Sequence, residues 1–192
     1  MESVWITGGG TGIGRELALA YARRGAQVWI SGRRAEVLAQ VVAEAEALQG
    51  QVSAVALDVT DALACAEAWR QVRDAAGKLN RIILNAGDHR EMPALEFNQE
   101  TVEHLINVNF YGVTRLIEQI LPDLREQGGQ LAVVASLAGY RGLPLAAAYG
   151  ASKAALINLT EALRVELEGG PVDLRLINPG FVRTPLTDRN QF

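Results

Sequence analysis

The fold is decided by residues 7–14, Thr7-Gly8-Gly9-Gly10-Thr11-Gly12-Ile13-Gly14, which join a short apolar run to a helical pattern. Glycines let the backbone turn tightly here, and the start of the following helix offers free N–H groups and a positive dipole end to an anion such as a pyrophosphate. The spacing T-G-x-x-x-G-x-G fits, whereas the common G-x-G-x-x-G does not, because residue 13 is isoleucine. A Walker loop is excluded, since no Gly-Lys-Ser/Thr follows. A turn without a ligand is the alternative.

Strand-like and helical stretches alternate outward from this loop. The predicted strands, most of them almost continuously apolar as in sheets covered on both faces, are Ser3–Thr7, Gln27–Ser31, Val52–Leu57, Arg81–Leu84, Gln130–Ala135 and Val172–Ile177. The predicted helices cover 12–24, 34–48, 61–76, 99–127 and 147–168, with a kink expected at Pro122. This order predicts a single α/β domain over residues 1–192, with a Rossmann-like, doubly wound parallel sheet of about six strands and helices on both faces.

The composition narrows the class of protein. The chain has 192 residues, of which 49% are hydrophobic and 21% charged, and its net charge is −4. These values are typical of one soluble domain without a general affinity for nucleic acid or anionic membranes. The amino terminus lacks the basic region of a signal peptide, and the apolar stretch 143–159 is broken by polar residues, so we expect a cytoplasmic protein with no membrane span. Cys65 alone excludes a disulfide framework, and the scattered His89 and His104 give no metal site.

Small and polar residues follow each predicted strand, at the sheet edge where such folds bind ligands. They are Gly8–Gly14, Gly32–Arg34, Asp58, Asn85–Gly87, Ser136 and Asn178–Gly180. Asp58 has two open interpretations: a hydrogen bond to an adenine amino group, or a cap on the helix that starts near Asp61. The small residues of Asn85-Ala86-Gly87 would let the chain pass against a cofactor, although an ordinary turn is the alternative.

The second strand ends in Ser31-Gly32-Arg33-Arg34, without the acidic residue that NAD-binding sites usually place against the ribose. Two guanidinium groups could bind a 2′-phosphate bidentately. A solvated basic first turn is the alternative, but positive charge at a helix amino terminus is unfavourable unless an anion binds there. The sequence therefore favours NADP(H) over NAD(H).

Tyr149 and Lys153 lie one helical turn apart on the same face. A phenol with a pKa of ~10 is a poor acid–base at neutral pH, and a neighbouring ammonium favours its phenolate. Ser136, after the fifth strand, could hydrogen-bond the same substrate oxygen; no histidine is placed to make it a nucleophile. Asn109 lies on an apolar helical stripe, as a satisfied core amide or a polar group that serves the site. Cys65 and Trp69 are interpreted as packing residues.

These residues together resemble the short-chain dehydrogenase/reductase family, from Val4 to about Pro185. TGGGTGIG is similar to its cofactor loop, LNAG to its N-N-A-G segment, YGASK to its Y-x-x-x-K motif, and Pro179–Thr184 to its P-G-x-V-x-T, beside the nicotinamide. The resemblance implies an NADP-dependent oxidoreductase acting on a small carbonyl/alcohol substrate. Tyr149 is then the general acid/base, and Lys153 binds the nicotinamide ribose and lowers the pKa of Tyr149. Ser136 orients the substrate oxygen, and Asn109 holds a water in the proton relay.

The cofactor site implied by the resemblance and the loop patterns is a longer set. It comprises Gly8, Gly10, Thr11, Gly12, Ile13, Gly14, Arg33, Arg34, Asp58, Val59, Asn85, Ala86, Gly87, Tyr149, Lys153, Pro179, Gly180, Val182 and Thr184. No metal ligand belongs to it.

Two departures from the family pattern stand out. Leu84 replaces the first Asn of N-N-A-G, and the sequence ends at Phe192, where family members continue to a further helix and a seventh strand. We therefore expect those elements to be missing, in a short protein or a partial sequence. The alternatives to an enzyme of this kind are a non-catalytic NAD(P)-binding regulatory protein and an epimerase or dehydratase of the family. Small and apolar residues on the helices near 99–127 and 147–168 predict a homodimer or homotetramer.

Overall fold

The computed structural model of the chain describes residues 1–184; Pro185, at the end of the expected family resemblance, lies outside them. The described part contains a six-stranded parallel sheet in the order β3-β2-β1-β4-β5-β6. The strands are β1 (Ser3–Thr7), β2 (Gln27–Gly32), β3 (Gln51–Ala56), β4 (Arg81–Leu84), β5 (Gly129–Val134) and β6 (Val172–Ile177). The prediction of a doubly wound α/β fold is confirmed, and predicted strand bounds differ by one residue at most.

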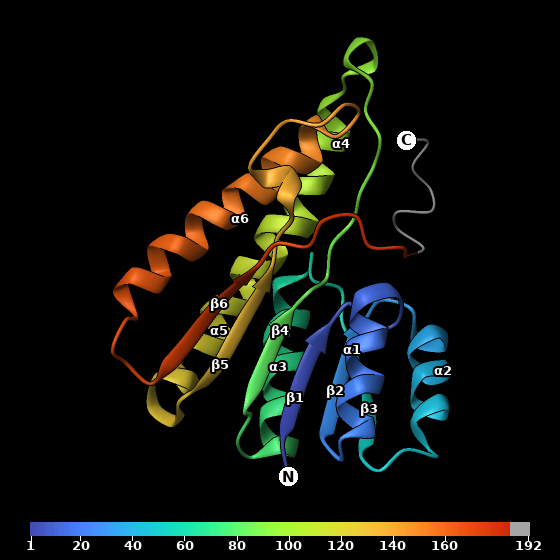
Figure 1. Cartoon of the computed structure of the whole chain (residues 1–192), viewed down its shortest axis with the longest axis vertical. Helices are drawn as coiled ribbons and strands as arrows, with labels where there is room; N and C mark the ends of the chain where they lie inside the picture. The colour runs from blue at the N-terminus through green and yellow to red at the C-terminus, as the bar shows by residue number, and fades with distance from the viewer. Residues whose placement is uncertain (185–192) are drawn as a thin grey trace.

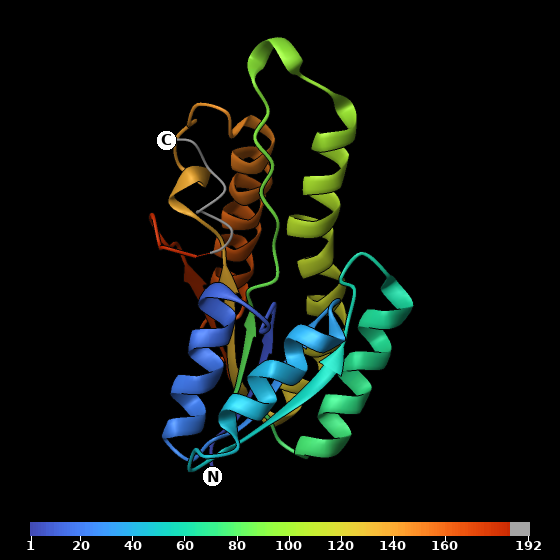
Figure 2. The same ribbon diagram turned by 90° about the vertical axis from the view of Figure 1, so that its right-hand side faces the viewer.

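Helices cover both faces of the sheet (Figures 1 and 2). On one face, α1 (Gly12–Arg23) and α2 (Ala35–Ala45) pack through Leu19, Leu38 and Val41 onto β1 and β2. On the other face, α3 (Ala62–Ala76), α5 (Gly112–Gln127) and α6 (Ala147–Glu166) form the larger hydrophobic core. Because all strands are parallel, their carboxyl ends lie at the same edge of the sheet.

Cys65 and Trp69 belong to this larger core, as their interpretation as packing residues predicts. The thiol is fully buried, and burial raises the pKa of Cys65 to about 11. The Trp69 ring stacks on Trp5 at a centroid distance of 5.7 Å and donates from Nε1 to Asp123 of α5. The Cys65 thiol also donates to the Val59 carbonyl oxygen at 3.6 Å.

The helix predicted over 99–127 is wrong as a single element. It consists of α4 (Gln99–Ile106), a wider π-helical turn η2 (Asn107–Tyr111), and α5. The interruption lies at η2 and not at Pro122, through which α5 continues to Gln127. Turns of this wider kind are frequent at functional sites, and this one contains Asn109.

Two short segments complete the described chain: η1 (Ala94–Glu96) at the tip of a long connection after β4, and η3 (Leu137–Gly139) after β5. None of the helices in residues 1–184 has the length and apolar content that a membrane crossing requires.

Candidate active site

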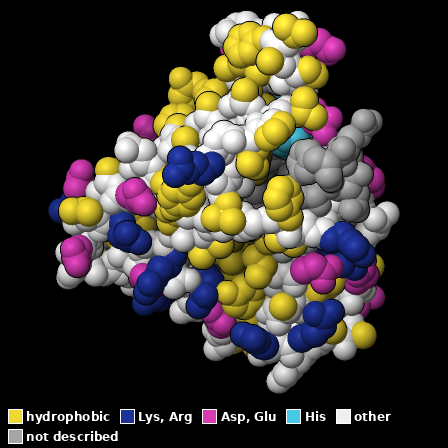
Figure 3. Space-filling view, turned by 45° about the horizontal axis from the view of Figure 1, so that its top comes forward, with side chains coloured by type: hydrophobic (Ala, Val, Ile, Leu, Met, Phe, Trp, Pro, Cys, Tyr) yellow, Lys and Arg dark blue, Asp and Glu magenta, His cyan; other side chains and the backbone are white. Residues whose placement is uncertain are grey.

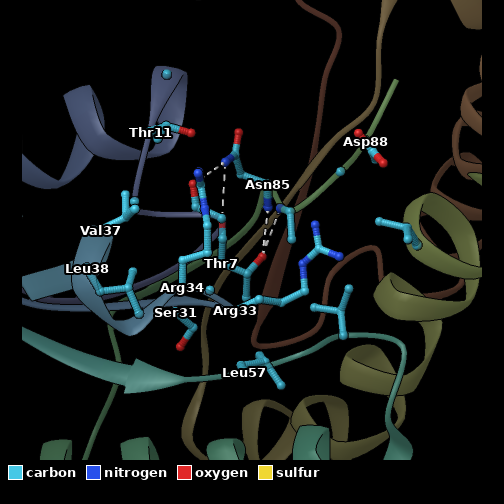
Figure 4. A pocket seen from close by; sticks show the side chains of 18 of the residues that line it. Thr7, Thr11, Ser31, Arg33, Arg34, Val37, Leu38, Leu57, Asn85 and Asp88 are labelled. Carbon is cyan, nitrogen blue, oxygen red and sulfur yellow. Dashed lines mark hydrogen bonds between the residues drawn. The ribbon is translucent and has the colours of Figure 1, made fainter. Parts of the chain in front are cut away.

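A cleft of about 410 Å³ lies at the carboxyl edge of the sheet, between the glycine loop and the ends of β2, β3 and β4 (Figure 4). From the predicted cofactor set, its lining includes Gly8, Gly10, Thr11, Gly12, Ile13, Arg33, Arg34, Asp58, Val59, Asn85, Ala86, Gly87 and Thr184. The structure therefore brings together most of the residues expected to hold a dinucleotide.

The floor of the cleft is a hydrogen-bonded junction between the ends of β1 and β4. Thr7 Oγ1 accepts from the backbone N–H groups of Asn85 and Ala86 at 3.0 and 3.1 Å. In return, Asn85 Nδ2 donates to the carbonyl oxygens of Thr7 and Gly8 at 3.1 and 3.3 Å. These hydrogen bonds fix the position of the glycine loop relative to the Asn85–Gly87 segment.

Gly14 has a packing role and does not line the cleft. A Cβ on Gly14 would lie 2.2 Å from the carbonyl oxygen of Gly8, so only glycine lets α1 start this close to the loop. Gly8 and Gly12 need glycine for another reason, since their φ angles are +67° and +54°. A Cβ on Gly12 would also meet the Thr184 side chain at 3.2 Å. The 179–184 segment thus lies against the glycine loop.

Arg33 and Arg34 are exposed at the end of β2, and Figure 4 shows both side chains between Val37 and Asp88. Arg34 stands immediately before α2 and makes no capping hydrogen bond with its side chain. The end of β2 carries no carboxylate, and the acid that faces Arg33 comes from the end of the neighbouring strand, Asp58. Positive charge is therefore available to a ligand at this end of the cleft.

Asp58 does not cap the following helix, so that alternative is wrong. Its Oδ1 accepts from the N–H and the hydroxyl of Thr60 at 2.9 and 2.7 Å, while Asp61 caps α3 by accepting from the N–H groups of Leu63 and Ala64. Burial alone would raise the pKa of Asp58, but the Thr60 hydrogen bonds and the charge of Arg33 outweigh it and lower that pKa. Asp58 is an anion at the cleft wall; its contact with adenine stays a prediction.

Ser136, Tyr149 and Lys153 meet where β5 ends beside α6. The Tyr149 hydroxyl hydrogen-bonds with Ser136. Lys153 is 4% exposed; its Nζ donates to the carbonyl oxygen of Val134 at 3.0 Å and lies 5.8 Å from the centroid of the Tyr149 ring. A phenol, a hydroxyl and an ammonium thus share one small region, as their positions in the sequence predict.

The electrostatics of this group differ from the expectation. Burial raises the pKa of Tyr149, and the hydrogen bond with Ser136 offsets this only in part. Burial also lowers the pKa of Lys153 to about 8. The pKa of Tyr149 is therefore not lowered as predicted, because burial outweighs the groups that favour the phenolate. At neutral pH the phenol therefore carries its proton.

Asn109 is fully buried and uses its whole side-chain amide to join two segments. Its Oδ1 accepts from the backbone N–H of Asp88 at 2.8 Å, and its Nδ2 donates to the Asp88 carbonyl oxygen and to Ser152 Oγ, both at 3.0 Å. The amide thus links the segment after β4 to α6, which carries Tyr149 and Lys153. A water held at this residue stays a prediction.

Gly87 connects the cleft to the catalytic group. A Cβ on Gly87 would lie 3.2 Å from Asn109 Oδ1 and 3.5 Å from Lys153 Nζ. Residue 87 also lines the cleft. The chain therefore passes close to the Asn109 and Lys153 side chains, and a Cβ at residue 87 would be tight against Asn109.

The 179–184 segment completes one side of the site. Pro179, Val182 and Thr184 line a second hollow against the start of α1, and the Pro179 carbonyl oxygen accepts from Leu137 N at 3.1 Å. Gly180 lines neither hollow. Figure 3 shows hydrophobic side chains gathered at the end of the molecule above the site. The exposed large hydrophobic residues include Leu95, Phe97, Leu137, Tyr140, Phe181 and Val182.

The predicted cofactor set does not contain several lining residues: Thr7, Ser31, Gly32, Val37, Leu38, Leu57, Asp88 and Val108, although Gly32 is named among the residues of the sheet edge. Thr7, Ser31, Gly32 and Leu57 lie at or next to strand ends, which was the available signal. Asp88 follows Gly87 directly, but its partner His104 lies on α4 and could not be assigned from spacing. Among residues 1–184, no cluster of three or more His, Cys, Asp or Glu side chains could hold a metal ion.

Comparisons with known proteins agree with this geometry. A family model described as short chain dehydrogenase matches residues 2–191. An uncharacterized oxidoreductase of Myxococcus xanthus (strain DK1622) is 42% identical over 188 residues, 97% of this chain and 74% of that protein. A short chain dehydrogenase/reductase from Burkholderia phymatum, solved in complex with NAD, has a TM-score of 0.92 at 28% identity and covers 100% of this chain and 73% of its own. An alcohol dehydrogenase from the archaeon Thermococcus sibiricus, complexed with 5-hydroxy-NADP, has a TM-score of 0.88 at 28% identity, covering 95% of this chain and 77% of its own.

Proposed function

The chain belongs to the short-chain dehydrogenase/reductase family of oxidoreductases, and from this premise we propose that it moves a hydride between NADP(H) and a carbonyl/alcohol pair, with Tyr149 as general acid/base. The observation that carries the proposal is the meeting of Ser136, Tyr149 and Lys153. These three residues do not line the cleft, but Lys153 Nζ lies beside Gly87, which does. A binding protein without turnover would not need a phenol hydrogen-bonded with a serine at this position.

The residues of the cleft fit a dinucleotide. The start of α1 presents backbone N–H groups to a pyrophosphate, Gly87 leaves room beside Lys153 and Asn109, and Arg33 offers charge at the far end. When bound, the nicotinamide supplies or accepts the hydride, and the protein contributes orientation and proton transfer. In this proposal Lys153 also binds the nicotinamide ribose.

The proton moves at the Tyr149 hydroxyl. Burial raises the pKa of Tyr149, so the phenol is protonated at neutral pH and ready to donate to a carbonyl oxygen as that oxygen gains negative charge. Ser136 binds the same oxygen and orients it. After transfer, the phenolate is stabilised by the Lys153 ammonium, whose Nζ lies 5.8 Å from the ring centroid.

The proposed preference for NADP(H) is supported by the positive charge at the end of β2. Arg33 and Arg34 line the cleft where β2 ends, and no carboxylate of that strand end opposes a 2′-phosphate. The solved relatives include both an NAD complex and a 5-hydroxy-NADP complex. The residues of this chain therefore carry the argument for NADP(H).

A spectrophotometric assay tests the proposal. The protein is mixed with NADPH and a panel of ketones and aldehydes, and loss of the NADPH absorbance is followed. We expect turnover on at least one carbonyl. Tight NADPH binding without turnover on any of them would favour the regulatory alternative, and sugar-nucleotide conversion without net NADPH loss would favour an epimerase or dehydratase.

We also propose a cytosolic homodimer or homotetramer formed through the helices α4, α5 and α6. The outer side of α6 carries exposed small and apolar residues together with polar and charged ones: Ala147, Ala151, Asn158, Glu161, Ala162, Arg164, Val165 and Glu166. Leu156 is fully buried in the core of its own subunit and is not part of this surface. Leu159 and Leu163 are partly buried beside it.

A further inference from the structure

Several residues of the connection after β4 contact the rest of the molecule. The His89 ring meets the Tyr149 ring edge-on at 4.9 Å, Met92 is buried, and Asp88 makes three hydrogen bonds to residues 104 and 109. This irregular segment runs from the sheet edge up to η1 (Figures 1 and 2). The backbone of Asp88 exchanges two hydrogen bonds with the Asn109 amide. Its carboxylate makes a second attachment, because Oδ2 lies 2.7 Å from Nε2 of His104. Farther along, the backbone N–H of Met92 donates to the Leu145 carbonyl oxygen at 2.9 Å.

His104 and Asn109 lie on one continuous helical stretch, α4 followed by η2. Asp88 therefore holds this stretch at two places, through its backbone at the π-helical turn and through its carboxylate at α4. The other groups near the carboxylate are the N–H of His89, which donates to Oδ1 at 2.9 Å, and Nε of Arg90 at 3.8 Å from Oδ2. The side chains of Asp88 and His104 are 22% and 24% exposed, so solvent reaches the pair.

We propose that Asp88 and His104 are a positioning pair for the reaction: their contact fixes Gly87 and Asn109 against Lys153. The inference rests on the proposed function. Gly87 is adjacent to Asp88 and has Asn109 Oδ1 and Lys153 Nζ at 3.2 and 3.5 Å from the place of a Cβ. A small shift of the 87–88 backbone would therefore move the cofactor wall and the catalytic group relative to each other. Misplacement on this scale lowers turnover more than it lowers binding.

The main rival explanation is a direct effect of the Asp88 charge on the cofactor. Asp88 lines the cleft, whereas His104 does not. Under the rival explanation, replacing Asp88 changes the NADPH dissociation constant and replacing His104 leaves turnover intact. Under the positioning proposal, both replacements lower kcat by a similar factor, and the double replacement is no worse than either one, because each breaks the same contact.

The test measures kcat, KM, the NADPH dissociation constant and the urea midpoint for Asp88→Ala, His104→Ala, the double variant, and His104→Gln. We expect kcat to fall about 10-fold in the first three variants, with NADPH affinity unchanged. His104→Gln should restore most of the loss, because its amide places an N–H donor near the position of Nε2. Glu103→Ala, an exposed change on the same helix, is the control. If His104→Ala does not fold, His104→Phe is used in its place, because phenylalanine keeps a ring and removes the donor.

Provided that the wild-type enzyme turns over, three results would each overturn the positioning role. They are an unchanged kcat in His104→Ala, additive losses of kcat in the double variant, and no recovery of kcat in His104→Gln. A loss of kcat that only follows a loss of folded protein would also overturn it. A wild type that is inactive on every carbonyl would instead overturn the proposed function, and this inference with it.

Discussion

In the proposed function, the choice between NADPH and NADH depends on Arg33. Arg33→Asp replaces a cation at the end of β2 by an anion, so a 2′-phosphate would lose a charge-assisted contact and meet repulsion. Loss of one such contact is worth roughly 1.5–3 kcal/mol, so we expect NADPH to bind at least about 10-fold more weakly and the gap to NADH to narrow or reverse. Arg70→Asp, an exposed change on α3, is the control. Equal affinities for NADPH and NADH in the unmodified protein would contradict the preference.

Lys153 gives a pH-dependent prediction with a defined sign. Its pKa is about 8 in the folded protein and ~10.4 in an unfolded chain, so the unfolded chain holds more protons between these values. The free energy of unfolding therefore rises with pH through this window, since the cost of burying the ammonium is present below pH ~8 and relieved above it. Relative to Lys153→Met, the wild type should gain on the order of 3 kcal/mol between pH ~7.5 and ~10.5, measured by urea unfolding. If the difference in unfolding free energy between the wild type and Lys153→Met stays constant with pH, the lowered pKa of Lys153 is refuted.

At the scale of single residues, the sequence is informative where a short motif fixes the spacing. Tyr149 and Lys153 are one turn apart, so their common face is known before the structure. The contact between Asp88 and His104 depends on how the connection after β4 meets α4, and no local pattern reports that. The direction of the Tyr149 pKa shift could not be predicted from the sequence either. Burial raises this pKa, and the burial of Tyr149 is known only from the structure.

At the scale of elements, strands were predictable because each is a short apolar run with a polar or small residue at its end. The helix over 99–127 was predicted wrongly because the apolar positions on both sides of η2 keep helical spacing. Nothing between them marks a wider turn. Tertiary contacts of Asn109 with Asp88 and Ser152 accompany the turn, and these join residues far apart in the chain.

The two aspartates around the start of α3 give a prediction at this scale. Asp61→Ala removes both capping bonds and should lower the free energy of unfolding by about 1 kcal/mol without changing NADPH affinity. Asp58→Asn keeps an acceptor for Thr60 but turns the remaining oxygen into a donor, which would oppose an adenine amino group. We expect weaker NADPH binding in Asp58→Asn, measured by calorimetry beside Asp61→Ala. An unchanged NADPH affinity in Asp58→Asn would show that Asp58 does not bind the adenine amino group.

At the scale of the whole molecule, the outer side of α6 predicts self-association. Light scattering at micromolar concentration should give at least twice 20.7 kDa. Ala162→Arg places a charged side chain on the exposed side of α6 and should shift the protein to monomer, because like charges would meet across the two-fold axis. Glu36→Gln, a mild exposed change on α2 at the other face of the sheet, serves as control. A wild-type monomer that is insensitive to concentration would exclude this assembly.

The central claim is that Tyr149 exchanges the proton with the substrate oxygen, and one comparison tests it most directly. Tyr149→Phe keeps the ring, and with it the contact with the His89 ring, and removes only the hydroxyl that bonds with Ser136. On a carbonyl that the wild type reduces, kcat should fall by ~10²-fold or more while the NADPH dissociation constant changes little. Near-normal turnover in the phenylalanine variant would contradict the claim.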